Sequence, residues 1–171
     1  QGNACRLDWE EVCPKNEKDE IYILGNPPYL GYARQSKEQK DDIKKVFFNI
    51  KDFKKLDYIA CWFLKASRYI MHSNNKVAFV STNSITQGEQ VGLLWPNILN
   101  KELEISFCHL SFKWTNNAKG NAGVSVVIVG IRRKSNKHKF IYSKGSVKNV
   151  SNINPYLVES SNLIVVPKNK S

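Results

Sequence analysis

Four consecutive residues, Asn26-Pro27-Pro28-Tyr29, have the types and the spacing to bind a planar amine. Proline locks its own φ at about −65°, lacks an N–H, and keeps the residue before it out of the helical region. The Asn26 side-chain oxygen and the Pro27 carbonyl can therefore face one point of a stiff backbone. Two fixed acceptors suit an NH2 group, and Tyr29 adds a flat face for stacking. A strand-terminating turn uses the same residue types, so both interpretations stay open on the tetrapeptide alone.

The elements that must position this motif follow from hydrophobic patterning. The apolar run 21–24 precedes it and predicts a strand that is buried on both faces. Ser36 and Gln39 fit a capping box that starts a lysine-rich helix ending near Phe48. The other predicted elements are a buried helix over 56–71, a strand over 77–80, a helix over 89–99 divided at Pro96, strands over 104–112 and 124–131, a short strand over 138–142 and a last apolar run over 163–166.

The resulting order β-α-α-β-α-β-β predicts an α/β fold. Residues 113–122 are too few for a helical crossover, so the strands on either side should be antiparallel. Ligands of open α/β sheets bind beyond the carboxyl ends of the parallel strands. The groups expected at that edge are Asn26 to Tyr29, the polar cluster 81–84 and Phe112. Their convergence favours a binding site over a simple turn.

The charge of the chain favours a polyanionic partner. Lys and Arg outnumber Asp and Glu by 26 to 15 in 171 residues, which gives a net charge of +11. Nucleic acid is the first expectation and an anionic membrane surface the second. The lysine-rich helix and the basic stretch 132–148 are either solvated surfaces or contacts to phosphate.

The cysteines and histidines predict no metal site. Four cysteines form no CxxC pair, and three scattered histidines complete no zinc spacing. Cys61 and Cys108 lie in apolar runs, as small buried hydrophobes do. No signal peptide or apolar run of 18 residues is present, so we expect a soluble, cytoplasmic chain and no membrane partner. The start at Gln1 without methionine suggests a piece of a longer protein.

The motif and the order of the segments after it resemble the S-adenosylmethionine-dependent DNA methyltransferases that modify the N6 amine of adenine. The resemblance covers residues 1–150 and includes the segment 56–66, the strand 77–84 and Phe112 before a valine-rich strand. The stretch Ser81–Gln90, with Phe112-Lys113-Trp114, is most similar to the methyltransferase part of bifunctional restriction–modification enzymes. Residues 151–171 would begin a linker or a DNA-recognition region.

The resemblance implies the target-base half of a Rossmann-like class I methyltransferase sheet, mixed through one late antiparallel strand. It places the four main strands in the order first, second, fourth, third. The family's glycine-rich cofactor motif is not found in this sequence. S-adenosylmethionine would therefore bind mostly outside the chain, and the isolated chain is expected to be inactive. Asn3, where the family commonly has an acidic residue, and Asn26 are the residues expected near the cofactor.

By the same resemblance, Asn26 and Pro27 would hold the adenine amine while Tyr29 stacks on the flipped base. Phe112 would cover the other face of the base, with Trp114 as the alternative. Core packing for Phe112 and a loop anchor for Trp114 stay open. Lys113 and Lys119 would contact phosphates of double-stranded DNA.

Other functions also fit the motif. A protein glutamine amide or a guanine amine in RNA presents the same planar nitrogen, and a non-catalytic nucleic-acid-binding fragment would use only the basic surface. The first strand should present a free edge, through which the isolated chain is expected to associate with a second copy.

Overall fold

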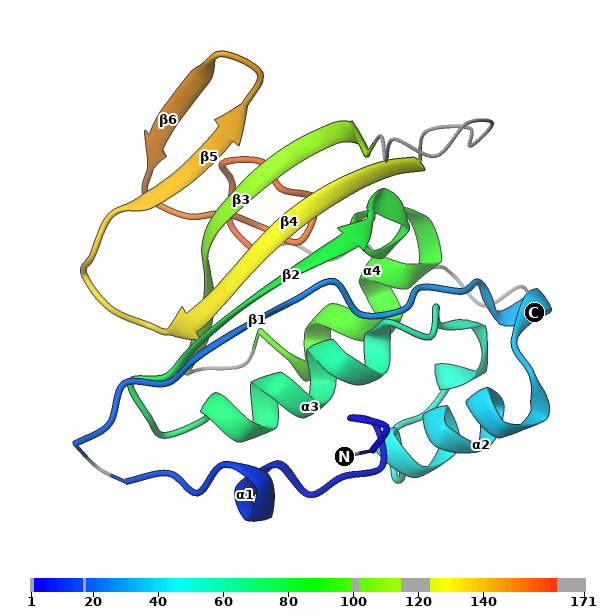
Figure 1. The fold of residues 1–171 in the computed structure, drawn as a ribbon. Helices are drawn as coiled ribbons and strands as arrows, with labels where there is room; N and C mark the ends of the chain where they lie inside the picture. The colour runs from blue at the N-terminus through cyan, green and yellow to red at the C-terminus, as the bar shows by residue number, and fades with distance from the viewer. Residues whose placement is uncertain (1, 17, 100–101, 115–123, 163–171) are drawn as a thin grey trace.

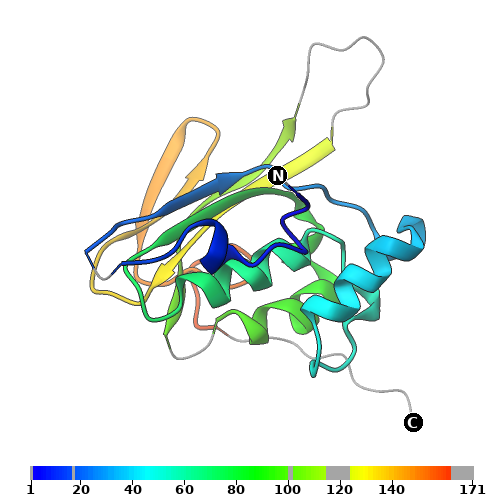
Figure 2. The same ribbon diagram turned by 60° about the horizontal axis from the view of Figure 1, so that its bottom comes forward.

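The computed structural model describes residues 2–16, 18–99, 102–114 and 124–162, and its centre is one mixed sheet with helices packed on one face (Figure 1). The same one-sided arrangement is visible after a 60° turn (Figure 2). The strands are β1 (Tyr22–Gly25), β2 (Lys76–Thr82), β3 (Leu103–Trp114), β4 (Val124–Arg133), β5 (Lys139–Ser143) and β6 (Ser146–Val150). Lys119 and the apolar run 163–166 lie outside the described residues.

The strand order confirms the arrangement that the resemblance implies. It runs β1-β2-β4-β3-β5-β6, with β1 parallel to β2 and β4 antiparallel to both β2 and β3. The predicted antiparallel pairing across the loop after Trp114 is thus confirmed. β5 lies parallel to β3, and β6 turns back against β5 as a second antiparallel strand that the sequence analysis did not predict.

β1 is an edge strand, and the expected burial on both faces is wrong for this chain. The side chains of Tyr22 and Leu24 are 57% and 74% exposed. Their apolar character predicted burial, but β1 has a described neighbour, β2, on one side only, so its outer edge and one face stay open. The free edge predicted for this strand is present within the described part of the chain. Association through it remains a prediction.

The helical layer lies on one face of the sheet, where α3 (Ala60–Ile70) packs against β2 and β4, and α2 (Lys37–Val46) packs against α3. α2 begins at Ser36 with the predicted capping box, in which Ser36 and Gln39 satisfy each other's backbone N–H groups. α3 is buried around most of its circumference, as expected. α4 (Gly88–Leu94) ends where Pro96 opens a 3-10 turn, which confirms the predicted division.

The helix predicted from Leu56 begins four residues later, at Ala60. The side chain of Asp57 accepts the N–H of Ile59 at 3.2 Å and so caps the segment before the helix. The N–H groups of Ala60 and Cys61 bond three residues back, to the carbonyls of Asp57 and Tyr58. This tight turn replaces the first turn of the predicted helix and leaves the Asp57 carboxylate available for other contacts.

A short helix, α1 (Trp9–Val12), lies in an N-terminal segment that runs beside α3 (Figure 2). Lys65 donates to the carbonyl of Leu7 at 2.8 Å, and Tyr69 donates to that of Cys13 at 2.6 Å. The rings of Trp9 and Tyr69 also meet edge to face. These contacts fix the N-terminal segment against the helical layer.

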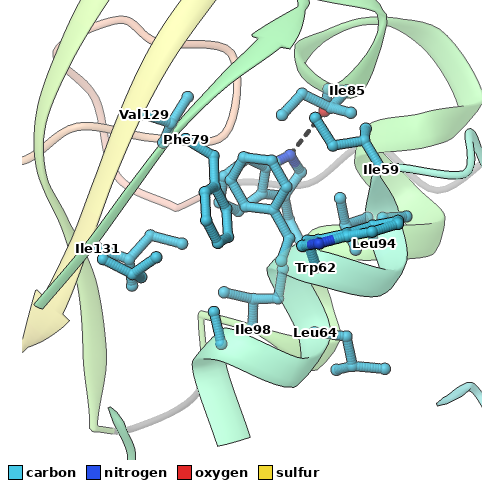
Figure 3. Close-up of a cluster of buried hydrophobic side chains, with 14 of the residues drawn as sticks. Ile59, Trp62, Leu64, Phe79, Ile85, Leu94, Ile98, Val129 and Ile131 are labelled. Atoms are coloured by element: carbon cyan, nitrogen blue, oxygen red, sulfur yellow. Dashed lines mark hydrogen bonds between the residues drawn. The ribbon is translucent and has the colours of Figure 1, made fainter. Parts of the chain in front are cut away.

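The core lies between the sheet and the helices and is built around aromatic rings (Figure 3). Phe63 of α3 meets Phe79 of β2 edge to face, with ring centroids 5.3 Å apart, and lies 5.9 Å from Trp95. The indole N–H of Trp95 donates to the carbonyl of Ile85 at 2.7 Å, so this buried polar group is satisfied. The core therefore holds the segment after β2 in place.

The β5–β6 hairpin extends the sheet beyond β3 (Figure 1). A buried carboxylate, Glu104 of β3, joins it to the main sheet: Arg132 lies 2.9 Å and Lys139 lies 3.0 Å from its two oxygens. After the hairpin, Ile153 and Leu157 are buried in the same core. The assignment of residues 151–171 to a linker or recognition region remains a prediction.

Within the described residues, no helix is both long enough and apolar enough to cross a bilayer.

Candidate functional site

The Asn26–Tyr29 motif directly follows β1, at the carboxyl end of that strand. Asn26 and Pro28 are exposed, Pro27 is buried, and Tyr29 is half-buried against the core. The motif is thus anchored at Pro27 and at Tyr29, while the amide of Asn26 faces solvent. An exposed amide on an anchored, proline-stiffened backbone is available to a ligand.

The residue after the motif is fixed by a set of hydrogen bonds. The N–H of Leu30 donates to the Asp57 carboxylate at 2.8 Å. The carbonyl of Leu30 accepts from the Gln35 side chain at 2.8 Å and from the N–H of Tyr58 at 3.0 Å. Both backbone groups of Leu30 are therefore satisfied by elements distant in sequence, and the direction of the chain leaving Tyr29 is set.

The carboxylate of Asp57 is buried, and burial raises its pKa. The N–H groups of Ile59, Leu30 and Tyr58 act in the opposite direction, because they stabilise the charged form without fully compensating for desolvation. The side chain of Gln90 accepts the N–H of Asp57 itself at 3.0 Å. Asp57 thus connects three parts of the fold: the residue after the motif, the turn before α3, and Gln90 of α4.

The carboxyl ends of β1, β2 and β3 lie at one edge of the sheet, because all three strands run in the same direction. Thr82 of β2 and Phe112 of β3 both pair with Val126 of β4, so they form one row across the sheet. Strands lie about 4.8 Å apart, so about 14 Å separate β1 from β3. A ligand bound across this gap could contact residues that follow or end both strands.

The polar cluster after β2 contributes to the same edge. Ser81 is fully buried, and its hydroxyl has no partner among the described residues. The hydroxyls of Thr82 and Ser84 are hydrogen-bonded to each other at 2.6 Å. These residues order the turn between β2 and the 3-10 segment Asn83–Thr86.

Phe112, Lys113 and Trp114 form the last residues of β3. Phe112 is half-buried, Lys113 is exposed, and Trp114 is 39% exposed. The rings of Phe112 and Trp114 are 6.3 Å apart and tilted by 45°. Within the described residues, no ring contact or hydrogen bond joins Phe112 to the Asn26–Tyr29 motif. The structure therefore brings the two groups to one edge without direct contact between them.

Asn3 is connected through Tyr58 to Leu30, the residue that follows the motif. Its side-chain amide donates to the Tyr58 hydroxyl at 3.3 Å, and its side-chain oxygen accepts the N–H of Cys5 at 2.9 Å. A carbonyl oxygen has two lone pairs, so Asn3, which is exposed, retains one acceptor site. The side-chain oxygens of Asn3 and Asn26 could each accept a hydrogen bond from an N–H group of a ligand.

The Tyr58 hydroxyl links Asn3 to an ion pair. It donates to Asp42 at 2.8 Å, and Arg6 contacts the same carboxylate at 2.8 Å. Burial raises the pKa of Asp42, but the hydrogen bonds from Arg6 and Tyr58 outweigh it, so the net pKa is lowered. Sequence patterning did not identify this network, because its hydrogen-bonded partners are 16 or more residues apart and share no periodicity.

One part of the basic stretch predicted to contact phosphate lines a groove of about 510 Å³. The basic residues of this groove are Lys18, Lys76, Arg132, Arg133, Lys134 and Lys137. This groove lies where β2 begins and β4 ends, at the opposite edge from the Asn26–Tyr29 motif. Contact with phosphate at either edge remains a prediction.

Comparison with known proteins identifies the family. The model of the MmeI DNA-methyltransferase domain matches residues 1–143. A protein of Bacillus subtilis (strain 168) described as DNA methyltransferase A is 48% identical over 169 residues, which cover 98% of this chain and 19% of that protein. The type IIL restriction–modification enzyme MmeI, solved in complex with DNA, is 43% identical, with a TM-score of 0.90 over 99% of this chain and 23% of that one.

This chain thus spans about a fifth to a quarter of the relatives that it matches. Over nearly all of its own length, however, it is 43% to 48% identical to them, and its fold matches that of the solved MmeI structure. The chain therefore belongs to the MmeI DNA-methyltransferase domain family.

Proposed function

We propose that this chain is the target-base half of a DNA methyltransferase that transfers a methyl group to the N6 amine of a flipped-out adenine, within a restriction–modification enzyme. The observation that carries the proposal is the placement of Asn26-Pro27-Pro28-Tyr29 and Phe112 at the shared carboxyl edge of β1 and β3. Family membership and the net charge of +11 support double-stranded DNA as the partner.

Asn26 and Pro27 would act on the amine of the base. The lone pair of that amine is delocalised into the ring, which makes the nitrogen a poor nucleophile. Hydrogen bonds from its two N–H groups to the Asn26 side-chain oxygen and the Pro27 carbonyl would draw the nitrogen towards tetrahedral geometry. The lone pair would then be localised and directed at the methyl donor, and the anchored backbone would hold the alignment.

S-adenosylmethionine, when bound, supplies a methyl group on a positively charged sulfur, so direct attack by the amine needs no covalent enzyme intermediate. In this chain Asn3 and Asn26 are the residues that would meet the cofactor, as acceptors for N–H groups. The free lone pair on Asn3 fits that role. The described residues otherwise contribute to the base side of the reaction, and the released proton can pass to solvent.

Aromatic residues would hold the base once it has left the duplex. A base inside the stack cannot reach the Asn26 amide, so it must be flipped. Tyr29 would cover one face and Phe112 the other, with Trp114 as the alternative to Phe112. Stacking on an aromatic side chain is worth about 1–3 kcal/mol per base, which helps to offset the cost of unpairing. Lys113 and Lys119 would contact phosphates nearby.

The test is methyl transfer by the protein that carries this chain, with isotopically labelled S-adenosylmethionine and duplex DNA, followed by mass spectrometry of the nucleosides. We expect N6-methyladenine, and a loss of about 100-fold or more in kcat for Asn26→Ala, as for removal of one preorganised hydrogen-bonding group. Asn74→Ala, at an exposed asparagine near the start of β2, is the matched control.

Three outcomes would contradict the proposal. Transfer to a glutamine-containing peptide or to RNA guanine, and not to DNA, would identify a different planar nitrogen as substrate. DNA binding without any transfer would indicate a non-catalytic binding role. Full activity of Asn26→Ala would show that the Asn26 side chain is not needed for methyl transfer.

A further inference from the structure

We infer that His109 is a positioning residue for the target base, because its ring packs against the ring of Phe112. The inference rests on the proposed function, in which Phe112 covers one face of the flipped adenine. The rings of His109 and Phe112 meet edge to face, with centroids 4.7 Å apart and planes at 70°. This is the shortest of the ring contacts that the described residues make.

An irregularity in β3 creates the contact. His109 pairs with Ile128 of β4, and Phe112 pairs with Val126, so three steps along β3 match two steps along β4. In a regular strand, residues three apart point to opposite faces of the sheet. The extra residue of this bulge turns the strand, so that His109 and Phe112 share one face. Phe112 owes its orientation to the bulge, and the ring of His109 lies directly against it.

The ring of His109 is itself held in place. Its Nδ1 lies 2.8 Å from the carbonyl of Leu110, and because a carbonyl only accepts, Nδ1 carries the proton. On the neighbouring strand, Tyr142 of β5 is the register partner of His109. A ring with a tethered nitrogen makes a firm support for a second ring.

The three rings form a column along β3 that we call the aromatic column: His109, Phe112 and Trp114. His109 is half-buried at its inner end, and Trp114 is exposed at its outer end. Phe112 lies between the two, and its ring has an aromatic neighbour on either side. A stacking platform that is already oriented loses less entropy when the base arrives. His109 would therefore affect the reaction without touching the base.

The experiment compares His109→Leu, which removes the aromatic edge, with His109→Phe, which retains a ring, in the protein that carries this chain. An aromatic pair of this kind corresponds to about a 2- to 12-fold effect, so kcat for methyl transfer should fall by that factor in His109→Leu. His109→Phe should keep kcat close to wild type. KM for DNA should not change, and Ser146→Ala, at an exposed position of β6, is the control.

A double-mutant cycle separates positioning from an independent role. If His109 acts through Phe112, adding His109→Leu to Phe112→Ala should cause no further loss. Additive losses, or wild-type kcat in His109→Leu, would overturn the inference while leaving the proposed function intact. Wild-type kcat in Phe112→Ala would overturn both the role of Phe112 and the inference. If His109→Leu unfolds early, His109→Phe decides: wild-type kcat supports positioning, and a loss equal to that of Phe112→Ala contradicts it.

Discussion

The carboxylate of Asp57 accepts the backbone N–H of Leu30 at 2.8 Å, across 27 residues of sequence. Leu30 directly follows the Asn26–Tyr29 motif, and Asp57 caps the turn that leads into α3. One side chain thus connects the geometry of the candidate site with the most buried helix of the fold. The backbone that leaves the candidate site is therefore tied to the core through one buried side chain.

Asp57→Ala should weaken both folding and methyl transfer. Leu30 and Ile59 would each lose their acceptor, and a hydrogen bond to a charged group contributes about 1.5–3 kcal/mol. Asp57→Asn keeps one acceptor oxygen and removes a charge whose burial is unfavourable, so its loss should be smaller. Chemical denaturation and methylation kinetics measure both effects, with Asp41→Ala as an exposed control. Equal losses in the Ala and Asn variants would show that the charge matters, and not the acceptor.

Gly130→Ala should disturb the open face of the sheet. A Cβ at this position would lie 2.2 Å from the ring of Phe107, well inside van der Waals contact. That ring also meets Tyr142 edge to face. Overpacking of this kind costs about 1–3 kcal/mol, measured as a lower free energy of unfolding. Combining Gly130→Ala with Phe107→Ala should remove the clash, so the double variant should show no additional loss over Phe107→Ala. Simple additivity would argue against the clash.

Much of the fold followed from local signals. The capping box at Ser36, the division at Pro96 and the antiparallel pairing after Trp114 each depend on a few neighbouring residues, and the structure has all three. β6 was not predicted because Ser146–Val150 is largely polar and pairs with β5 through its backbone. The burial of β1 was predicted wrongly because apolar character does not report where a strand lies in the sheet.

The candidate site could be predicted only in part. The Asn26–Tyr29 motif is contiguous, so its chemistry can be inferred directly from the sequence. The bond from Asp57 to Leu30 and the contact from His109 to Phe112 depend on tertiary pairing and on a bulge. Neither the extra residue in β3 nor its effect is marked by a glycine or proline. A histidine three residues before the aromatic was the one available signal, and in a regular strand that spacing predicts opposite faces.

Glu104→Ala should be among the most destabilising single changes in the sheet. Arg132 and Lys139 both contact this buried carboxylate, and both are mostly buried themselves. Removing one partner of a buried ion pair costs about 3–5 kcal/mol, because the remaining charges lose compensation. Glu89→Ala, which removes an exposed pair with Lys55, should cost about 0–1 kcal/mol. Urea unfolding of the two variants makes the comparison, and similar losses would contradict it.

The exposed edge of β1 should mediate self-association of residues 1–171. Leu24 is 74% exposed in a strand whose outer edge has no partner strand among the described residues, a combination that favours pairing with a second strand. Leu24→Lys places a charge at this edge and should shift the chain towards the monomer. Sedimentation equilibrium over a range of concentrations measures the shift. A wild-type chain that stays monomeric at the highest concentration would refute the prediction.

The contribution of Asp42 to the free energy of unfolding should decrease as the pH falls into the acid range. Its pKa is lowered in the folded state by Arg6 and Tyr58, so the folded protein binds this proton less readily than the unfolded chain does. The contribution is therefore fully present above the unfolded pKa of about 3.9 and is lost as the pH falls through the lower, folded value. Denaturation of wild type and Asp42→Asn at a series of pH values tests this. The difference in unfolding free energy should be largest near neutral pH and shrink in acid. A difference that stays constant down to the lowest pH at which the protein folds would mean that the network acts through packing, and not through the charge of Asp42.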